Sequence, residues 1–499
     1  MLAWTIYITF TGVLVLMLLP RDNAQLARVV ALLTAIAGCV VAFAGALQQT
    51  NPGAVTTIIK VPWISAIGAN YYLAADGISL TLVVLTGLAA VTGILFSWNI
   101  EKRTKEFFAF YLALIGGVYG VFLSFDLLLL FVFYELTIIP KYFLIARWGS
   151  TNKEYGAMKL AIYSFVGSHL VLIGMIAAWV VAFRQLGHGS LDLLELSKVT
   201  FPLAFQHWVF PLVFVGFAIL AGMWPFHTWA PTGHVAAPTA GSMLLAGVVM
   251  KLGAYGCLRV AMLLFPEGVH EWQWAIAALA VVGIVYGAGV ALVQQDFKFV
   301  VGYSSVSHMG FVLLGLATLN PIGLTGAVLQ MFSHGIIAGL LFGVVGRMVY
   351  DRTHTRDFSK LEHMNVGKLL PFAGITFVIA GVASMGLPGF SGFVAELQVL
   401  MGAWTAFPKL TVLSGVGVVV GVAYTLRAVQ KGFYADAPAD ASTEHEHPLE
   451  PISFPEKVGA GMLIGASLII GLFPGLLMDW IEPCFKSPLF ERLLKGGAL

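Results

Sequence analysis

Long apolar runs recur along the whole chain and limit the folds that it can adopt. A hydrocarbon layer roughly 30 Å thick selects helical segments of about 20 apolar residues, because every backbone polar group inside it must be hydrogen-bonded within its own segment. Fourteen such runs occupy residues 3–19, 27–47, 77–98, 107–124, 127–146, 158–183, 208–224, 236–262, 272–294, 299–318, 324–349, 369–405, 411–433 and 457–479. The sequence therefore predicts an all-α polytopic membrane protein with about fourteen transmembrane helices.

The composition argues against a soluble domain and against chemistry that needs a bound cofactor. Charged residues make up 10% of the 499 residues, whereas soluble domains carry about 25%. The net charge of +2 and the lack of a basic cluster interleaved with aromatic residues argue against nucleic acid as a partner. Cys39, Cys257 and Cys484 stand alone, and no nucleotide-binding motif occurs. We expect no cofactor, metal or redox chemistry in this chain.

Two of the apolar runs are expected to form discontinuous helices. The run at 369–405 is too long for one span and is interrupted by Gly386-Leu387-Pro388-Gly389. The run at 208–224 stops at Pro225 and is followed by Pro231. Broken helices at membrane depth occur where the backbone is buried in protein or lines a water-filled cavity. These breaks predict an internal polar site.

The distribution of positive charge predicts the orientation. Cytoplasmic loops carry an excess of Lys and Arg, and the loops after odd-numbered helices are richer in them, while Lys198 and three basic residues of the C-terminal tail weaken the bias. The basic residues are Arg21, Arg28, Lys102, Arg103, Lys105, Arg147, Lys153, Arg352, Arg356, Lys360, Lys368, Arg427 and Lys431. Both termini are therefore expected to face the periplasm of a bacterial inner membrane.

Three of the charged residues inside apolar runs are candidates for a function, because a charge there costs at least ~2.5–3.5 kcal/mol. Glu135 lies five residues before Pro140, Lys251 lies deep in the eighth run, and Glu396 follows the glycine-rich break. We interpret each as a proton carrier. The alternatives are a structural hydrogen bond for Glu135 and snorkelling to the membrane rim for Lys251.

Two histidines are further candidates for proton carriers. His308 and His334 lie inside the tenth and eleventh runs, each directly after a serine. Histidine titrates near neutral pH and can pass a proton from one ring nitrogen to the other. We interpret both as proton carriers, with a satisfied core histidine as the alternative. Titratable groups on separate helices predict an internal file of water.

Four further polar residues have weaker readings. His227 and His234 flank the proline-rich break near a helix end, where they could take up protons or cap the helix. Asp126 precedes the fifth run and is expected to be a helix cap. His169 is not accompanied by other candidate polar residues in its run, and we interpret it as a structural residue.

One segment of the chain is expected to be disordered. Residues Ala435–Pro455 are rich in Ala, Asp, Glu, His and Pro. His445 and His447 lie within it in a Glu-His-Glu-His sequence, and a solvated loop is preferred there over a metal site.

Five spaced motifs resemble those of subunit M of NADH:quinone oxidoreductase, respiratory complex I, and of its chloroplast and cyanobacterial counterparts. The motifs are Glu135-Leu136-Thr137-Ile138-Ile139-Pro140, Pro225-Phe226-His227-Thr228-Trp229, Ala237-Pro238-Thr239-Ala240-Gly241-Ser242, Tyr303-Ser304-Ser305-Val306-Ser307-His308-Met309-Gly310 and Gly392-Phe393-Val394-Ala395-Glu396-Leu397. The resemblance implies an antiporter-like fold with two inverted five-helix repeats. The expected divisions are 1–106, 107–262 for the first repeat, 263–434 for the second, and 435–499 for a cytoplasmic linker and last helix.

The resemblance also implies roles for individual residues. It makes Glu135 the helix-five glutamate, Lys251 and the two histidines the central carriers, and Glu396 the terminal glutamate, with His234 as a further site residue. One position departs from the pattern, because Leu220 stands where the family has a lysine on helix seven. Without that cation, Glu135 is expected to be hard to ionise. Lys141 lies six residues after Glu135, about 240° round an ideal helix, and is expected to be a poor substitute.

The expected function is that of a proton-translocating membrane-arm subunit in a complex I-like NADH or ferredoxin:quinone oxidoreductase. Flavin, iron–sulfur clusters and quinone would belong to partner subunits, and the chain would contact other membrane-arm subunits and the lipid bilayer. A thylakoid location is the alternative to the bacterial membrane. A subunit of an Mrp-type cation/proton antiporter, a non-pumping structural copy motivated by Leu220, and a subunit of a specialised related complex remain alternatives.

Overall fold

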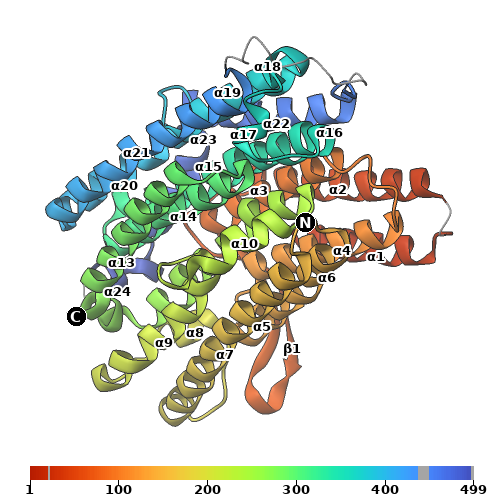
Figure 1. Cartoon of the computed structure of the whole chain (residues 1–499). Coiled ribbons are helices and arrows are strands. Elements are labelled where there is room, and N and C mark those ends of the chain that lie inside the picture. The colour runs from red at the N-terminus through yellow and green to blue at the C-terminus, as the bar shows by residue number, and fades with distance from the viewer. Residues whose placement is uncertain (21–22, 436–448, 496–499) are drawn as a thin grey trace.

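The protein is a body of packed helices with one projecting hairpin (Figure 1). The computed structural model describes residues 1–20, 23–435 and 449–495. In the first half the helices are α1 (Ala3–Leu18), α2 (Ala24–Leu47), α3 (Gly77–Leu95), α4 (Thr104–Leu123), α5 (Leu127–Leu136), α6 (Ile138–Trp148), α7 (Lys153–Leu186), α8 (Leu193–Leu196), α9 (Leu203–Ala221), α10 (Trp229–Ala236), α11 (Thr239–Leu244) and α12 (Met250–Gly256). A 3-10 turn, η2 (Phe226–Thr228), precedes α10, and π-helical stretches η3 (Leu245–Val249) and η4 (Cys257–Met262) flank α12.

The second half continues the same pattern. Its helices are α13 (Pro266–Val293), α14 (Phe297–Ala317), α15 (Pro321–Phe342), α16 (Asp351–Thr353), α17 (Phe358–Leu361), α18 (Val366–Leu369), α19 (Pro371–Ser384), α20 (Ser391–Ala406), α21 (Pro408–Phe433), α22 (Phe454–Leu472), α23 (Gly475–Phe485) and α24 (Pro488–Lys495), with a π-helical stretch η5 (Gly343–Tyr350) after α15. All fourteen predicted runs are helical, and twelve described segments are long and apolar enough to cross a membrane. The prediction of a polytopic helical membrane protein is confirmed.

The all-α fold class is confirmed, and the structure adds one element between α2 and α3 that the sequence analysis did not predict. Strands β1 (Thr56–Ile64) and β2 (Ala69–Ala75) pair antiparallel and form the hairpin that projects from the helices (Figure 1). This segment is rich in β-branched and aromatic residues, which favour strands, and it is too short to register as a membrane span. Lys60 of β1 forms an ion pair with Asp192 at 2.5 Å, which ties the hairpin to the loop before α8.

The two predicted helix breaks are present, and glycine makes both possible. Gly222 ends α9 with φ of 83°, and Gly386 and Gly389 separate α19 from α20 with φ of 74° and 102°. This left-handed region is open to glycine because it has no Cβ. Helices α5 and α6 are divided only at Thr137, three residues before Pro140; its backbone dihedrals are helical, and together they form one span, Leu127–Trp148.

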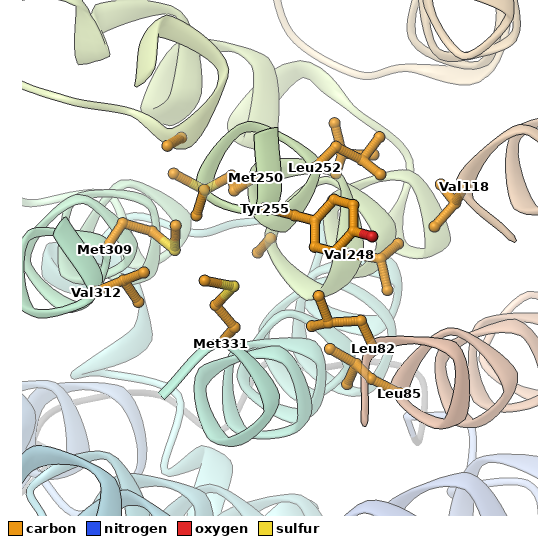
Figure 2. Packing of buried hydrophobic residues seen from close by; sticks show 14 of the residues in the cluster. Leu82, Leu85, Val118, Val248, Met250, Leu252, Tyr255, Met309, Val312 and Met331 are labelled. Carbon is orange, nitrogen blue, oxygen red and sulfur yellow. The ribbon is translucent and has the colours of Figure 1, made fainter. Parts of the chain in front are cut away.

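The centre of the protein is built from two segments that are enclosed by other helices. The stretch Thr239–Met262 and the stretch Pro321–Thr353 are both fully buried in their apolar windows. Side chains from α3, α12, α14 and α15 meet in this core (Figure 2). The residues predicted as proton carriers in the second half of the chain lie on or beside these central helices.

Helix α22, the last of the predicted spans, is held by buried ion pairs that the sequence analysis did not predict. Glu456, at the start of α22, accepts from Arg347 at 2.6 Å and from Arg352 at 2.9 Å. Arg352 also donates to the Glu450 and Pro451 carbonyls. The prediction of disorder is therefore wrong for residues 449–455. Residues 436–448, with His445 and His447, lie outside the described residues.

A second buried ion pair joins α3 to the segment after α12. Arg259 is fully buried and Asp76 is 1% exposed. The guanidinium Nη2 contacts both carboxylate oxygens at 2.7 Å and the group lies over the rings of Phe125 and Tyr255. Asp76 also accepts from the Ser79 backbone amide and so caps α3.

We predict that Arg259→Met destabilises the protein by about 3–5 kcal/mol, because it leaves the Asp76 carboxylate buried without its cation. The double variant Arg259→Met with Asp76→Asn is expected to lose less, since no lone charge remains. Denaturant unfolding of the purified protein in detergent measures both. Equal losses in the single and double variants would contradict this account.

Candidate functional site

The site begins at Lys251, the second residue of α12, which directly follows the π-helical stretch η3. Lys251 has 0% exposure, so it does not snorkel to the membrane rim. Its Nζ donates to the carbonyl oxygen of Ala246, five residues earlier within η3. Stretches of π-helix leave backbone carbonyls out of the usual pattern and often occur at functional sites. The backbone of the same helix thus holds the ammonium group.

A row of hydrogen-bonding side chains leads away from Lys251. Its Nζ lies 2.7 Å from Nδ1 of His334 on α15. The rings of His334 and His308 are 5.5 Å apart between their centroids. His308, on α14, places Nδ1 2.9 Å from Oε1 of Glu396 on α20 and Nε2 3.1 Å from the hydroxyl of Ser384 on α19. Four of the predicted site residues therefore lie in one row.

A small cavity fills the gap between the two histidine rings. Its volume is about 10 Å³, and His308, His334, Ser333, Ser384 and Glu396 are among the residues that line it. A cavity of roughly 10–15 Å³ is the smallest that accommodates one water molecule. His334 directs Nε2 to no protein partner among the described residues, so a ring N–H remains available at this gap.

Apolar packing closes off the neighbouring side of the row. Met250, Met309 and Met331 converge from α12, α14 and α15 (Figure 2). All three are fully buried, and two of them are sequence neighbours of Lys251 and His308. Methionine fills irregular gaps without adding a strong polar group. Lys251 and His308 therefore have apolar neighbours on this side, and their side-chain hydrogen bonds to other members of the row lie on the other side.

His234 and Lys298 extend the charged region toward the end of α10. His234 is fully buried, stacks on Phe342 with centroids 4.8 Å apart, and lies within electrostatic reach of both Lys251 and Lys298. Lys298 is 3% exposed and donates to the Ala237 carbonyl at 2.6 Å. The carbonyls at the end of a helix carry partial negative charge, which suits a cation.

Sequence reasoning missed Lys298 and Gln330. Lys298 lies in the first turn of α14, where a cation is disfavoured by the helix dipole, and that misplacement was a usable signal. Gln330 donates to Glu396 at 3.3 Å and lies one helical turn before His334 on α15. A lone glutamine in an apolar run gave no comparable signal.

The remaining predicted residues lie apart from the row. Glu135, at the end of α5, is half-buried and makes no side-chain hydrogen bond to Lys251 or either central histidine. His227 is buried beside the rings of Tyr286 and Tyr303. His169 is exposed and bonds to its own helix at Phe165.

Two further readings can be compared with the geometry. Asp126 accepts from the amides of Leu128 and Leu129, so its reading as a helix cap is confirmed. Leu220 is 1% exposed on α9, where its backbone lies against Gly253 of α12. The position of the expected lysine is therefore occupied by a packed apolar side chain.

Comparisons with known proteins agree with this architecture. Residues 124–421 match the family described as NADH:quinone oxidoreductase/Mrp antiporter, TM. NADH-quinone oxidoreductase subunit M of Rhodobacter capsulatus is 35% identical over 87% of this chain and 85% of its own length. The same subunit of Pseudomonas aeruginosa is 34% identical over 96% of this chain and 95% of its own length.

Solved structures give the same result. A chain of respiratory complex I from Thermus thermophilus superposes with a TM-score of 0.87 at 26% identity, and the match covers 100% of both chains. A chain of the Mrp complex from Dietzia sp. gives 0.82 at 19% identity over 99% of both, which shows a shared fold alone. From its motifs, its fold and these relatives, the chain belongs to the family of NADH-quinone oxidoreductase subunit M, an antiporter-like membrane subunit.

Proposed function

We propose that this chain carries protons through the membrane arm of a complex I-like assembly, along the row Lys251, His334, His308 and Glu396. The observation that supports this most strongly is the continuity of the row. Two hydrogen bonds and one water-sized cavity link four titratable side chains from four helices. A buried row without such a function would be costly, because each charge inside a membrane protein needs compensation.

The contacts suggest an order of proton transfer. A protonated Lys251 donates to Nδ1 of His334, which therefore carries its other proton on Nε2. Taking the Lys251 proton on Nδ1 lets His334 release the Nε2 proton toward the cavity and so toward His308. His308 then passes a proton from Nδ1 to Glu396. Each step moves one proton between neighbouring groups. Afterwards Lys251 is neutral and His334 carries its remaining proton on Nδ1, so Lys251 must be reloaded and that ring proton must return to Nε2 before the next transfer.

We assign the return of a proton to Lys251 to His234 and Lys298, which lie on one side of the row. Both are buried, and Lys298 and Lys251 both lie within electrostatic reach of His234. Glu396 lies beside the break between α19 and α20, where unwound backbone leaves carbonyls and amides free to bind water. We therefore propose uptake near α10 and release near α20.

The energy would come from partner chains. The relatives are named as NADH-quinone oxidoreductase subunits, and we place flavin, iron–sulfur clusters and quinone in other subunits of the assembly. The chain would then be part of a translocating oxidoreductase, of the EC 7.1.1 type, without redox chemistry of its own. Other membrane-arm subunits, the lipid bilayer and protons would be its partners.

We further propose an arrangement of repeats and an orientation. Residues 107–262 would form the first five-helix repeat and 263–434 the second, inverted relative to it, with 1–106 before them and 435–499 after. The discontinuous pairs α9 with α10 and α19 with α20 support this pairing, one in each repeat. Both termini would face the periplasm of a bacterial inner membrane, or the corresponding side of a thylakoid membrane.

Cation/proton antiport is the second candidate, and the likeness to an Mrp subunit extends only to the fold. The two candidates differ in what drives transport. Sodium-driven proton movement in vesicles that lack the redox partners would favour antiport. A non-pumping structural copy is the third candidate, because Leu220 replaces the lysine expected in the first repeat.

We predict that Lys251→Met slows proton transfer through this chain by roughly 100-fold, since a proton would have to cross an apolar gap at a cost of about 2.5–3.5 kcal/mol. The measurement is the ratio of protons translocated to electrons transferred by the assembly in proteoliposomes. Lys409→Met, at an exposed position in the first turn of α21, is the matched control. An unchanged ratio in Lys251→Met would favour the non-pumping copy.

The orientation gives a separate prediction. The native cysteines Cys39, Cys257 and Cys484 are all buried, so the background of thiol labelling is low. Lys198→Cys is expected to react with an impermeant maleimide added outside spheroplasts, whereas Lys102→Cys reacts only after lysis; both positions are exposed. The reverse pattern would invert the proposed orientation.

A further inference from the structure

Helix α7 carries one polar side chain on a face that none of the other described elements covers. Its inner face packs against α9, where Gly167 and Gly174 lie against Gly216 and Val213. Its outer face lies at the edge of the helical body (Figure 1), and His169 is exposed there in the middle of an apolar stripe. The exposed apolar residues before and after it include Ile162, Phe165, Val166, Ile173, Ile176 and Val180.

The position of His169 along α7 places it deep in the membrane. The helix has 34 residues, and His169 is at its middle. The nearest lysine and arginine along the helix are Lys159 and Arg184, which lie ~15 Å and ~22 Å away at a rise of about 1.5 Å per residue. The hydrocarbon layer is roughly 30 Å thick. A side chain as short as histidine therefore reaches neither membrane surface.

The ring of His169 has one nitrogen bound and the other free. Nδ1 lies 2.6 Å from the carbonyl oxygen of Phe165, one helical turn earlier. A carbonyl oxygen only accepts, so Nδ1 carries the proton of this bond, and the lone pair of the neutral ring lies on Nε2. No described residue donates a hydrogen bond to Nε2. The exposed side of the ring is thus an acceptor without a donor.

Lipid tails do not provide the donor that Nε2 lacks, because they have no polar hydrogen. Polar side chains at this depth almost always face protein or a water-filled cavity. Histidines on membrane helices form hydrogen bonds to neighbouring helices. The similar chains in solved structures come from complexes, namely respiratory complex I and an Mrp complex. A helix of another subunit is therefore the occupant that the chemistry of this face favours.

We propose that the outer face of α7 is an interface with another membrane subunit of the assembly, and that a transmembrane helix of that subunit donates a hydrogen bond to Nε2 of His169. The donor is a hydroxyl, amide or indole group at the depth of His169, and the apolar residues of the stripe pack against the same helix. His169 then acts in assembly and takes no part in the row from Lys251 to Glu396. The inference rests on the proposed function only for the identity of the partner.

A photo-cross-linker one helical turn from His169 tests which molecule covers this face. Ile173 is 53% exposed and is replaced by p-benzoylphenylalanine, while His169 is kept. The intact assembly is irradiated in its membrane and purified, and mass spectrometry identifies the adduct. We expect an adduct with another membrane subunit. The same replacement of Val419, on the apolar outer face of α21, is the comparison and is expected to give lipid adducts.

Substitution of His169 tests the hydrogen bond itself. His169→Leu should lower the ratio of assembled to free chain by about 3- to 20-fold, the effect of one hydrogen bond between membrane helices. Native gels across a detergent series measure this ratio. His169→Gln should keep most of the association, because the amide oxygen of glutamine can take the place of Nε2. Ile173→Leu conserves volume on the same face and is the control, with no change expected.

The outcomes separate this inference from the proposed function. Adducts of Ile173 with lipid alone, or with a second copy of this chain, would overturn the interface and leave the proposed function standing. An unchanged ratio of assembled to free chain in His169→Leu would overturn the hydrogen bond. A proton-to-electron ratio that is insensitive to Lys251→Met would refute the proposed function and leave the interface standing, because neither the adduct nor the detergent series depends on transport.

Discussion

The cost of placing charge in a low-dielectric interior governs the structure, and the protein meets it in two different ways. Asp76 with Arg259, and Glu456 with Arg347 and Arg352, are closed groups whose charges are compensated by direct contacts of 2.6–2.9 Å. Such pairs hold helices together and have no reason to exchange protons. The row from Lys251 to Glu396 is different, because it contains a gap and a ring nitrogen without a protein partner.

That difference separates structural charge from transport. A closed ion pair is stable because removal of either partner is expensive, so it is a poor carrier. A carrier must bind its proton and also release it, which requires neighbours of comparable affinity at hydrogen-bond distance. In the proposed path a lysine, two histidines and a glutamate on four helices are the neighbours, with direct contacts of 2.7 and 2.9 Å. The buried methionines Met250, Met309 and Met331 pack together on the same helices (Figure 2).

Much of this could be predicted from the sequence. Helix positions follow from apolar length, and the two breaks follow from proline and glycine, because both signals are local. The β1–β2 hairpin was missed because a search for spans ignores short segments. The row was predicted as a set but not as a sequence of contacts, and Lys298 was passed over. The burial of Lys298 and its bond to the Ala237 carbonyl depend on how α14 packs against α10.

The π-helical stretch before Lys251 has a consequence for how this lysine could be moved. A π turn accommodates one residue more than an α turn, so the stretch Leu245–Val249 holds one residue more than the same turn of an α-helix would. Returning that residue to α geometry would rotate everything beyond it by about 100°, the angle that one residue spans. A register change of a single residue would thus turn the side chain of Lys251 away from His334.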